Sequence, residues 1–520
     1  MPHLFISAAH KSSGKTTITL GLCAALTQRG QRVQPFKKGP DYIDPLWLTQ
    51  AAGRSCGNLD FYTMTTAEIS AVFARRMRGA DIGIIEGNKG LYDGLDLDGS
   101  NSNAALAKLL QAPVVLVIDA RGMTRGIAPL ILGYQHFDPE VRIAGVILNQ
   151  LGGSRHESKL RAVIEHYTDV TVLGAVHRDP QLEIVERHLG LMPSNETPEA
   201  AQRIGRIAAA VASQVDLDAL QAIAASAPTP AVLAALPMNL KINSGSGGQF
   251  GRKFGDCGLS PAPPHEPAAE GLTALPSPAN GRRWPEGPDE VEGTRIRLGI
   301  ARDAAFGFYY PDDLDALRAG GAELVPIDTL RDTRLPTIDG LFIGGGFPET
   351  QMQLLSANAT LRGEIRAAIE AGLPVYAECG GLMYLARSLR WGERQYPMVG
   401  VIPGDVVMHE RPQGRGYIRL RETGAGLWPA EPAAPTPLEF NAHEFHYSSL
   451  ENLPADTRYA YQVLRGNGVD GQHDGIVYKN LLACYGHLRD AANHHWTARF
   501  LQFVRACKQP STHSLSVTSL

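Results

Sequence analysis

The 520-residue sequence predicts two α/β domains that are separated by a linker. In residues 1–240, apolar runs such as "DIGIIEG" (81–87) and "APVVLVIDA" (112–120) alternate with helical patterns. Runs that are apolar at successive positions are typical of strands buried on both faces, and so of a mostly parallel sheet covered by helices. Residues 241–294 are rich in Gly, Ser and Pro, which indicates a flexible linker or insertion. The strand–helix rhythm returns over 295–507, and residues 508–520 are expected to form a disordered tail.

Composition excludes several classes of partner. The chain has 49 Lys and Arg against 53 Asp and Glu, so nothing predicts binding to nucleic acid or to a membrane surface. No apolar run reaches the roughly 18 residues that a membrane-spanning helix needs. The six cysteines are far apart and form no CxxC pair, and the first residues do not have the pattern of a signal peptide. We therefore expect a cytoplasmic protein.

The stretch "SAAHKSSGKTTIT" (7–19) follows a short apolar strand and opens a helical pattern. A glycine-rich turn at this place presents backbone N–H groups to phosphate oxygens, and the helix N-terminus favours negative charge. Lys15 would reach the β- and γ-phosphates, and the Thr16 hydroxyl would bind Mg²⁺. Ala9 stands where the full pattern has glycine, a residue that permits φ > 0. The residues expected to contact ATP are Ser13, Gly14, Lys15, Thr16 and Thr17.

Two later segments add charge to this predicted site. "PFKKGPDYIDP" (35–45) places two lysines and two carboxylates around a Gly-Pro turn, and "IIEGNKGLYDG" (84–94) places Glu86 at the end of a strand. Ligands of open α/β sheets bind at the carboxyl ends of strands, where a carboxylate can hold Mg²⁺. Asp41, Asp44 and Asp93 have turn capping as their alternative role. Asn149 could read an adenine edge or form a turn.

A second chemistry is indicated by "LPVYAECGGLMYLARSL" (373–389), which reads as strand, tight turn and helix with Cys379 at the turn. This resembles a nucleophile elbow, although Ala377 replaces the leading glycine. The following helix N-terminus is expected to lower the thiol pKa. The glycines of "FIGGGFPE" (342–349), Gly345 and Gly346 among them, could present an oxyanion hole. A buried structural cysteine is the alternative.

A reactive thiolate also needs a base. The residues alone leave five histidines open for this role, and all of them lie late in the chain. They are His443, His446, His487, His494 and His495.

At this point the sequence resembles a known family. The N-terminal half is similar to dethiobiotin-synthetase-like P-loop ATPases, and the C-terminal half to class I glutamine amidotransferases of the cobyrinate and cobyrate type. In this order they resemble the cobyrinate a,c-diamide synthase family over nearly the whole chain except 241–294 and the tail. The segments that carry the resemblance are "FKKGPDYIDP", "EGNKGLYDG", "ERHLGLMPS", "ARDAAFGFYYPDDLDALRAGGAEL", "GGGFPE", "ECGGLMYL" and "HEFHYS".

The resemblance implies a carbon–nitrogen ligase of cobalamin biosynthesis. Glutamine would be hydrolysed at Cys379 through a thioester, and ATP would phosphorylate a carboxylate of a corrin ring, which ammonia then amidates. The "CYGHL" motif selects His487 as the base, and because Arg489 stands where an acid is usual, a Cys–His dyad is expected.

Related ATPases also suggest which residues serve the nucleotide and the metal. The metal ligands would be Thr16, Asp41 (or Asp44 in its place) and Glu86. The residues placed near the acyl phosphate are Lys38, Asp44 and Asp93.

Two alternatives accompany this interpretation. Sirohydrochlorin or sirohaem could be the tetrapyrrole that is amidated, since both carry acetate side chains. A partitioning-type ATPase switch would need a signature lysine where His10 stands, and it would lack the cysteine turn. The implied ligands are Mg²⁺, ATP, glutamine and a corrinoid or related tetrapyrrole, and a homodimer is the assembly considered.

Overall fold

The computed structural model describes residues 1–182, 184, 186–187, 190–197, 199–228, 295–430 and 437–508. The described residues of 1–228 and 295–508 together belong to one compact unit. The predicted linker at 241–294 lies outside the described residues, and so does the predicted tail apart from Lys508. Within the described ranges, no helix is both long enough and apolar enough to cross a bilayer.

The N-terminal sheet has seven strands in the order β3-β2-β4-β1-β5-β6-β7, and every neighbouring pair is parallel. This confirms the predicted parallel sheet, and the apolar runs of the sequence are its strands. In chain order the strands are β1 (His3–Ala8), β2 (Val33–Lys38), β3 (Gly57–Leu59), β4 (Ile82–Glu86), β5 (Val114–Asp119), β6 (Ile143–Leu151) and β7 (Thr171–His177).

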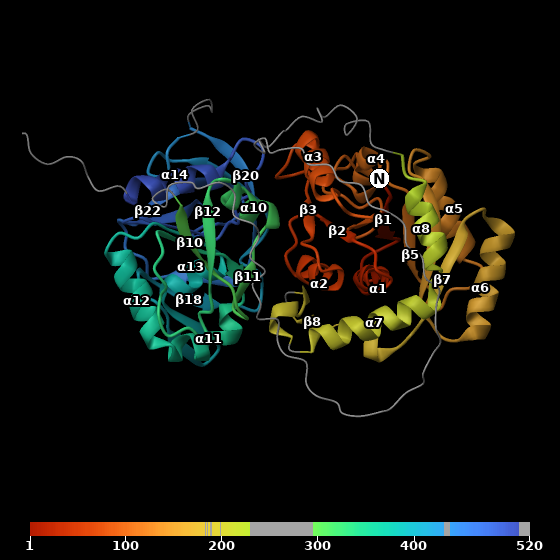
Figure 1. Ribbon diagram of the computed structural model, residues 1–520, viewed down its shortest axis with the longest axis horizontal. Helices are drawn as coiled ribbons and strands as arrows, with labels where there is room; N and C mark the ends of the chain where they lie inside the picture. The colour runs from red at the N-terminus through yellow and green to blue at the C-terminus, as the bar shows by residue number, and fades with distance from the viewer. Residues whose placement is uncertain are drawn as a thin grey trace, which may run out of the picture. The chain divides into compact units, whose positions relative to one another are not determined.

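Helices cover both faces of this sheet, as Figure 1 shows. Side chains of β1 alternate between two cores: Leu4 and Ile6 pack into one, and Phe5 into the other. The first core contains α1 (Lys15–Gln28), α2 (Ile43–Ala52), α7 (Ala200–Gln214) and α8 (Leu217–Ala225). The second contains α3 (Thr66–Arg76), α4 (Asn103–Leu110), α5 (Ile127–Phe137) and α6 (Ser154–Tyr167). Small elements follow β7: η1 (Pro180–Leu182), β8 (Glu186–Arg187), β9 (Gly190–Leu191) and η2 (Ser194–Glu196).

The second sheet has nine strands in the order β12-β10-β13-β15-β24-β23-β22-β19-β20. Its first five strands are parallel to their neighbours, and the remaining pairings are antiparallel. The strands are β10 (Ile296–Ala301), β12 (Ala322–Ile327), β13 (Gly340–Ile343), β15 (Val375–Glu378), β19 (Gly414–Glu422), β20 (Glu439–His446), β22 (Arg458–Arg465), β23 (His473–Tyr478) and β24 (Leu481–Cys484).

Helices also pack on both faces of the second sheet. One core takes side chains from α11 (Pro348–Ala357), α12 (Ala359–Glu370) and α13 (Gly380–Leu385), and the other from α10 (Pro311–Ala319) and α14 (Trp496–Lys508). Two small sheets complete this half. Their strands are β11 (Phe306–Phe308) and β14 (Gly345–Gly346) in one, and β16 (Ala386–Trp391), β17 (Arg394–Pro397), β18 (Ile402–Met408) and β21 (Ser448–Glu451) in the other.

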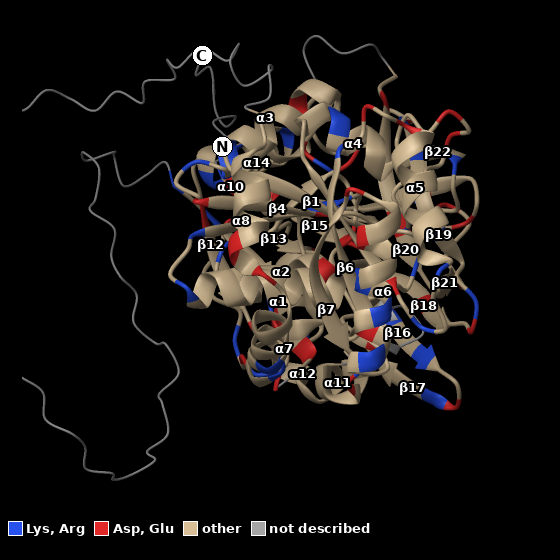
Figure 2. Cartoon of the chain, turned by 90° about the vertical axis from the view of Figure 1, so that its right-hand side faces the viewer, with Lys and Arg blue, Asp and Glu red and all other residues tan. Residues whose placement is uncertain are grey.

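Charges of both signs are interspersed over the face shown in Figure 2. This distribution agrees with the near balance of basic and acidic residues in the sequence.

Candidate functional site

The predicted phosphate loop connects β1 to α1, which begins at Lys15. Gly14 has φ of 83° and Ser12 has φ of 65°, so the backbone turns through the left-handed region twice before the helix starts. A Cβ at Gly14 would collide with the Asn149 side-chain amide, which donates to the Ser13 carbonyl at 3.0 Å. The loop is therefore shaped to leave the N-terminus of α1 open to an anion.

Ala9 does not require the conformation that glycine would provide. It is absent from the described residues with positive φ, and its carbonyl accepts a hydrogen bond from the Tyr134 hydroxyl. The strained positions of the loop are Ser12 and Gly14 instead. The departure from the glycine pattern is thus compatible with the observed backbone.

Carboxylates converge on the start of α1. The Thr16 hydroxyl donates to Glu86 Oε1 at 2.8 Å and lies 3.4 Å from Asp44 Oδ2. Lys37 lies at their centre: its Nζ contacts Asp44, lies 2.7 Å from Glu86 Oε1, and is 3.9 Å from Asp41 Oδ2. The sequence analysis named Lys38 and did not single out Lys37.

These residues fit a magnesium ion, since all of the donors are oxygens. Glu86 Oε2 is buried and has no hydrogen-bond partner, so one oxygen of the cluster is left free. Among the described residues, however, no three acidic, histidine or cysteine side chains form a ready-made metal cage. An ion here would share Thr16, Asp44 and Glu86 with nucleotide oxygens and water, as Mg²⁺ usually does.

Lys37 supplies the positive charge that this cluster needs. Burial alone would lower the pKa of Lys37, but Asp44, Glu86 and Asp41 raise it well above its ordinary value. Burial and the Lys37 charge lower the pKa of Lys15, which is 8% exposed. Lys37 is already paired with these carboxylates, so an incoming phosphate would be bound by Lys15 and would favour the charged form of its ammonium.

The other predicted nucleotide and substrate residues lie nearby in different roles. Asp41 Oδ1 accepts the Ile43 N–H at 2.9 Å and so caps the start of α2, which leaves Asp44 as the carboxylate closer to Thr16. Lys38 Nζ is 3.4 Å from Asn88 Oδ1. Asp93 Oδ2 accepts the Gly90 N–H at 2.8 Å. Thr17 lies in the first turn of α1.

The strand–turn–helix predicted around Cys379 is present. Cys379 lies between β15 and α13 with φ of 49°, a strained value for a residue with a side chain. Its N–H donates to the Cys484 carbonyl at 2.7 Å, which ties the turn to β24. The thiol is 6% exposed and lies 4.0 Å from the Phe445 carbonyl. This is the geometry of a nucleophile elbow.

The expected lowering of the thiol pKa is wrong for this structure. Burial, and then the charge of Glu349, raise the pKa of Cys379 above its ordinary value. The helix that follows has only six residues, so its dipole is small compared with the loss of hydration. The thiol therefore depends on a base to become a nucleophile.

Gly345 and Gly346 lie between this turn and His487. A Cβ at Gly380 would be 2.9 Å from the Gly346 carbonyl oxygen, and one at Gly345 would be 2.5 Å from His487 Cε1. Larger residues would fill the space between nucleophile and imidazole. The two glycines thus border the place where a substrate carbonyl would bind.

His487, the histidine selected from the family motif, lies beside an acid, although a Cys–His dyad without an acid is expected from the sequence. His487 Nδ1 lies 3.5 Å from Glu378 Oε2, and both side chains are almost fully buried. Arg489, which takes the usual place of the acid, turns away and donates to the Asn58 carbonyl at 2.9 Å. The sequence could have drawn attention to Glu378 only through its place beside Cys379.

The other histidines have different surroundings. His494 stacks on Phe440 with ring centroids 3.8 Å apart, and His446 stacks on Tyr485 at 3.9 Å. His443 exchanges backbone hydrogen bonds with His487. His495 belongs to the segment just before α14. His487 is thus the histidine that lies beside both Gly345 and an acid.

Tyr42 touches residues of both sites. It lies between Asp41 and Asp44 in sequence, and its ring centroid is 4.9 Å from that of His487. The ring also packs at 4.6 Å from Tyr310 and at 5.4 Å from Phe308. The phosphate-loop side of the molecule therefore covers the imidazole of the cysteine site. This contact gives no sequence signal, because it joins residues far apart in the chain.

A cavity of about 690 Å³ lies beside these residues and is lined by both halves of the compact unit. From the N-terminal half it takes Lys38, Lys89 and Asp93, and from the C-terminal half Arg415 and Arg465. Tyr62 and Tyr417 stack on its wall with ring centroids 4.1 Å apart. Its lining also includes Asp60, Asp93 and Asp96, so four basic and three acidic side chains lie beside the aromatic wall. Such a cavity suits a large, flat ligand that carries anionic groups.

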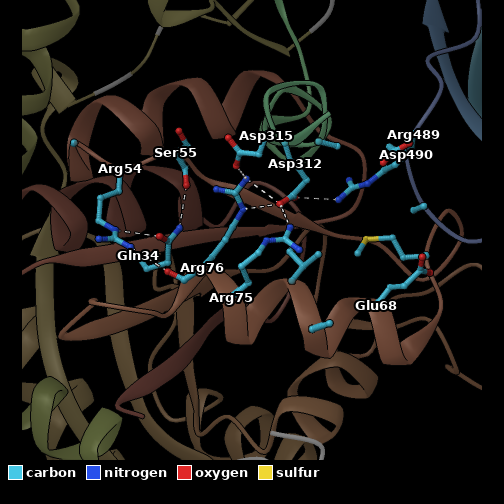
Figure 3. A pocket seen from close by; sticks show the side chains of 17 residues that line it. Gln34, Arg54, Ser55, Glu68, Arg75, Arg76, Asp312, Asp315, Arg489 and Asp490 are labelled. Atoms are coloured by element: carbon cyan, nitrogen blue, oxygen red, sulfur yellow. Dashed lines mark hydrogen bonds and ion pairs between the residues drawn. The ribbon is translucent and has the colours of Figure 1, made fainter. Parts of the chain in front are cut away.

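A second cavity, of about 840 Å³, has in its lining a group of charged side chains that already pair with one another. Figure 3 shows Arg75 and Arg76 of α3 pointing at Asp312 of α10, with Arg489 approaching the same carboxylate. Arg489 also lies over the Tyr310 ring at 4.5 Å. This network joins the halves of the unit.

Both halves of the chain match known protein families. Residues 5–191 match the model of the CobQ/CobB/MinD/ParA nucleotide binding domain, and residues 297–494 match that of the CobB/CobQ-like glutamine amidotransferase domain. Cobyrinate a,c-diamide synthase of Magnetococcus marinus is 44% identical over 97% of each chain. The chain belongs to the cobyrinate a,c-diamide synthase family.

Other members of the family align over a similar length. The Methanosarcina acetivorans protein of the same name is 40% identical over 95% of this chain and 93% of its own. The one from Archaeoglobus fulgidus is 37% identical over 96% and 97%. The similarity therefore spans the phosphate loop and the cysteine turn alike.

Proposed function

We propose that the protein is an ATP- and glutamine-dependent ligase that amidates the a and c carboxylates of cobyrinate, or of hydrogenobyrinate, in cobalamin biosynthesis. Residues 1–240 would carry the ATP-dependent ligase and residues 295–507 the glutaminase. The observation that supports this most directly is Tyr42, which follows Asp41 and packs against His487. A phosphate loop and a cysteine elbow joined through one side chain suit a reaction that needs both.

In the glutaminase, His487 would take the Cys379 proton as the sulfur attacks the carboxamide carbon of glutamine. Backbone N–H groups at Gly345 and Gly346 would stabilise the oxyanion, a contribution that can reach several kcal/mol. Ammonia leaves with the proton from His487, and water hydrolyses the thioester to glutamate. The buried thiol and imidazole exclude bulk water until glutamine binds.

In the ligase, a carboxylate is a poor electrophile and must first be activated by phosphoryl transfer. Lys15 and the loop N–H groups would bind the transferring phosphate, and Lys37 would neutralise the acidic residues around it. A magnesium ion, when bound by Thr16, Asp44 and Glu86, would offset phosphate charge. Asn149 keeps the loop in shape through the Ser13 carbonyl.

The 690 Å³ cavity is the place we assign to the tetrapyrrole. Lys38, Lys89, Arg415 and Arg465 offer positive charge to the carboxylates of its rim, and the aromatic pair Tyr62–Tyr417 offers a flat apolar wall. Asp93 belongs to the same cavity, close to the ligase residues. An acetate side chain held there would lie near the phosphate loop.

A product assay tests this function. The protein is incubated with MgATP, glutamine and either cobyrinate, hydrogenobyrinate or sirohydrochlorin, and the products are analysed by mass spectrometry. We expect two successive replacements of OH by NH₂ on the corrinoid. Amidation of sirohydrochlorin alone would instead favour the related tetrapyrrole reaction, and no amidation of any of them would refute the proposal.

A matched variant separates the two half-reactions. Cys379→Ala should abolish glutamine-driven amidation and keep amidation driven by ammonium salts. A partitioning-type switch would release no ammonia from glutamine in either protein. Loss of both activities in the variant would contradict the assigned division between the two sites.

A further inference from the structure

A buried acid stands directly before the nucleophile, at the end of β15. The Glu378 side chain is 3% exposed, and its Oε2 lies 3.5 Å from Nδ1 of His487, which is itself 2% exposed. Nδ1 of His487 has no hydrogen-bond partner at ordinary distance. Glu378 Oε2 is therefore the acidic oxygen that faces an otherwise unpartnered imidazole nitrogen.

The other oxygen of Glu378 is already occupied. Oε1 accepts hydrogen bonds from the Tyr376 hydroxyl and, at 2.8 Å, from the Leu488 N–H. These contacts fix the direction of the carboxyl group and also hold the chain one residue beyond His487. One side chain thus positions both the ring and the backbone of the base.

The fold explains why these residues meet. β15 and β24 are parallel neighbours, and Glu378 lies opposite Cys484 in their register. His487 follows three residues later, at the same end of the sheet. Cys379 and His487 follow adjacent strands and lie at the same end of the sheet. Glu378 therefore lies close to the imidazole of His487, the group that an acid at position 489 would be expected to contact.

We propose that Glu378 is the positioning residue of the glutaminase, holding the Nδ1–H of His487 so that Nε2 is free to accept the proton of the Cys379 thiol. The inference rests on the proposed function. The thiol proton moves to Nε2 as sulfur bonds to the carboxamide carbon, and it leaves with ammonia when the carbon–nitrogen bond breaks. Water then cleaves the thioester and returns a proton to sulfur, while Glu378 forms no covalent bond.

The surroundings make the two groups depend on each other. Burial raises the pKa of Glu378 to about 8 and lowers that of His487 below its ordinary value. The carboxylate and the imidazolium are each costly alone in this site, and together they neutralise each other. Loss of the carboxylate would therefore make protonation of His487 by the thiol less favourable.

A purely structural role for Glu378 makes a different prediction. Its contact with Leu488 could serve only to anchor the loop that carries His487. Glutamine at position 378 keeps a carbonyl oxygen that can accept both hydrogen bonds now made by Oε1. Glu378→Gln therefore preserves the anchor and removes the carboxyl group that can become negative opposite Nδ1 when His487 takes up a proton.

The experiment uses the full-length protein with the substitution Glu378→Gln. We expect kcat for glutamine hydrolysis to fall about 100-fold, the size of a lost general-base contribution, while KM for glutamine changes much less. Burial and, after it, nearby acids that include Glu378 raise the pKa of Cys379, so removal of the Glu378 charge by itself would let iodoacetamide alkylate the thiol at a lower pH. If Glu378 acts by supporting the protonated form of His487, alkylation in Glu378→Gln should instead require a pH higher by about one unit or more. Amidation driven by ammonium salts should remain, which shows that the chain is folded and that the ligase works.

A second buried Glu–His pair supplies the comparison. Glu444 Oε2 lies 3.7 Å from His446 Nε2, and both side chains are almost fully buried. Glu444→Gln should leave the pH dependence of Cys379 alkylation unchanged. If Glu444→Gln shifts it and Glu378→Gln does not, the inference is overturned and His446 becomes the base.

Two further outcomes decide the matter. Glutamine turnover by Glu378→Gln within a few-fold of the unsubstituted protein would show that the residue only anchors the loop. Absence of ammonium-driven amidation in the unsubstituted protein would instead contradict the proposed ligase function. The alkylation profile would still report on Glu378 in that case.

Discussion

Lys37 is the residue whose removal should reveal the charge balance of the ligase site. Its ammonium is 4% exposed and contacts Asp44 and Glu86, with Asp41 at 3.9 Å. Lys37→Met keeps a side chain of similar length but leaves these acids without their cation. Breaking a buried ion pair by removing one partner typically costs about 3–5 kcal/mol. We expect the free energy of unfolding to fall by that amount without nucleotide.

Magnesium nucleotide should restore part of this loss. A ligand at about 100 times its Kd stabilises a folded protein by about 2.7 kcal/mol through mass action alone. In Lys37→Met, magnesium also neutralises carboxylates that have no other cation. The gain in stability on adding magnesium to the nucleotide complex should therefore be larger for Lys37→Met than for the unsubstituted protein. Urea unfolding followed by fluorescence, without ligand, with ADP alone and with MgADP, measures both effects.

The control is an ion pair at the surface. Lys108 Nζ lies 2.8 Å from Asp138 Oδ2 with 35% of its side chain exposed. Exposed pairs contribute about 0–1 kcal/mol, so Lys108→Met should change stability little and should not respond specifically to magnesium. Equal stability of Lys37→Met and the unsubstituted protein, or an equal magnesium effect in both, would refute the reasoning.

Three other predictions concern the cysteine site and its cover. Cys379→Ser should lose glutamine hydrolysis by more than about 100-fold while keeping ammonium-driven amidation; undiminished glutamate formation by the serine variant in a coupled assay would show that the reaction does not depend on the thiol. The Tyr42 hydroxyl interacts with that of Tyr310, while its ring packs against His487. Tyr42→Phe keeps the ring and should leave the glutamate formed per amide near that of the unsubstituted protein, whereas Tyr42→Ala exposes His487 and should raise it; equal ratios in both variants would contradict the role given to the ring. Because the folded pKa of Glu378, about 8, lies above its ordinary value of 4.5, the folded state binds this proton more tightly and stability falls as pH rises between these values. Glu378→Gln should therefore be more stable than the unsubstituted protein at pH 8 and lose this advantage near pH 5, as urea midpoints would show; the opposite order would mean that the carboxylate stabilises the fold.

The sequence predicts the parts of both sites that follow from local chain geometry. The apolar runs place Glu86 and Cys379 at strand ends, and a glycine-lysine-threonine turn after the first strand places Lys15 and Thr16 at a helix start. These features depend on neighbours in sequence, so one chain suffices to find them. The predicted linker and tail fall outside the described residues and stay predictions.

Residues that depend on pairing across the fold could not be chosen in the same way. Lys37 and Lys38 are adjacent, and only the pairing of β2 with β4 decides that Lys37 lies beside Glu86. The capping contact of Asp41 likewise leaves Asp44 closer to Thr16. Ala9 departs from the glycine pattern of phosphate loops. That pattern gives residue types and not backbone angles, so the sequence alone could not show that Ser12 and Gly14, and not Ala9, adopt positive φ.

Arg489 connects the two halves of the compact unit directly. It is two residues from His487, and its guanidinium is held by the Asn58 carbonyl at the edge of the N-terminal sheet and by Asp312. Asn58 in turn donates to the carbonyls of Gly39 and Asp41, in the segment that leads to Asp44. If that segment shifts when nucleotide binds or leaves, the movement would reach Arg489 through Asn58, and then His487, which lies two residues before Arg489. Arg489, at the position where an acid is usual, therefore connects the residues near the phosphate loop with those near the catalytic cysteine.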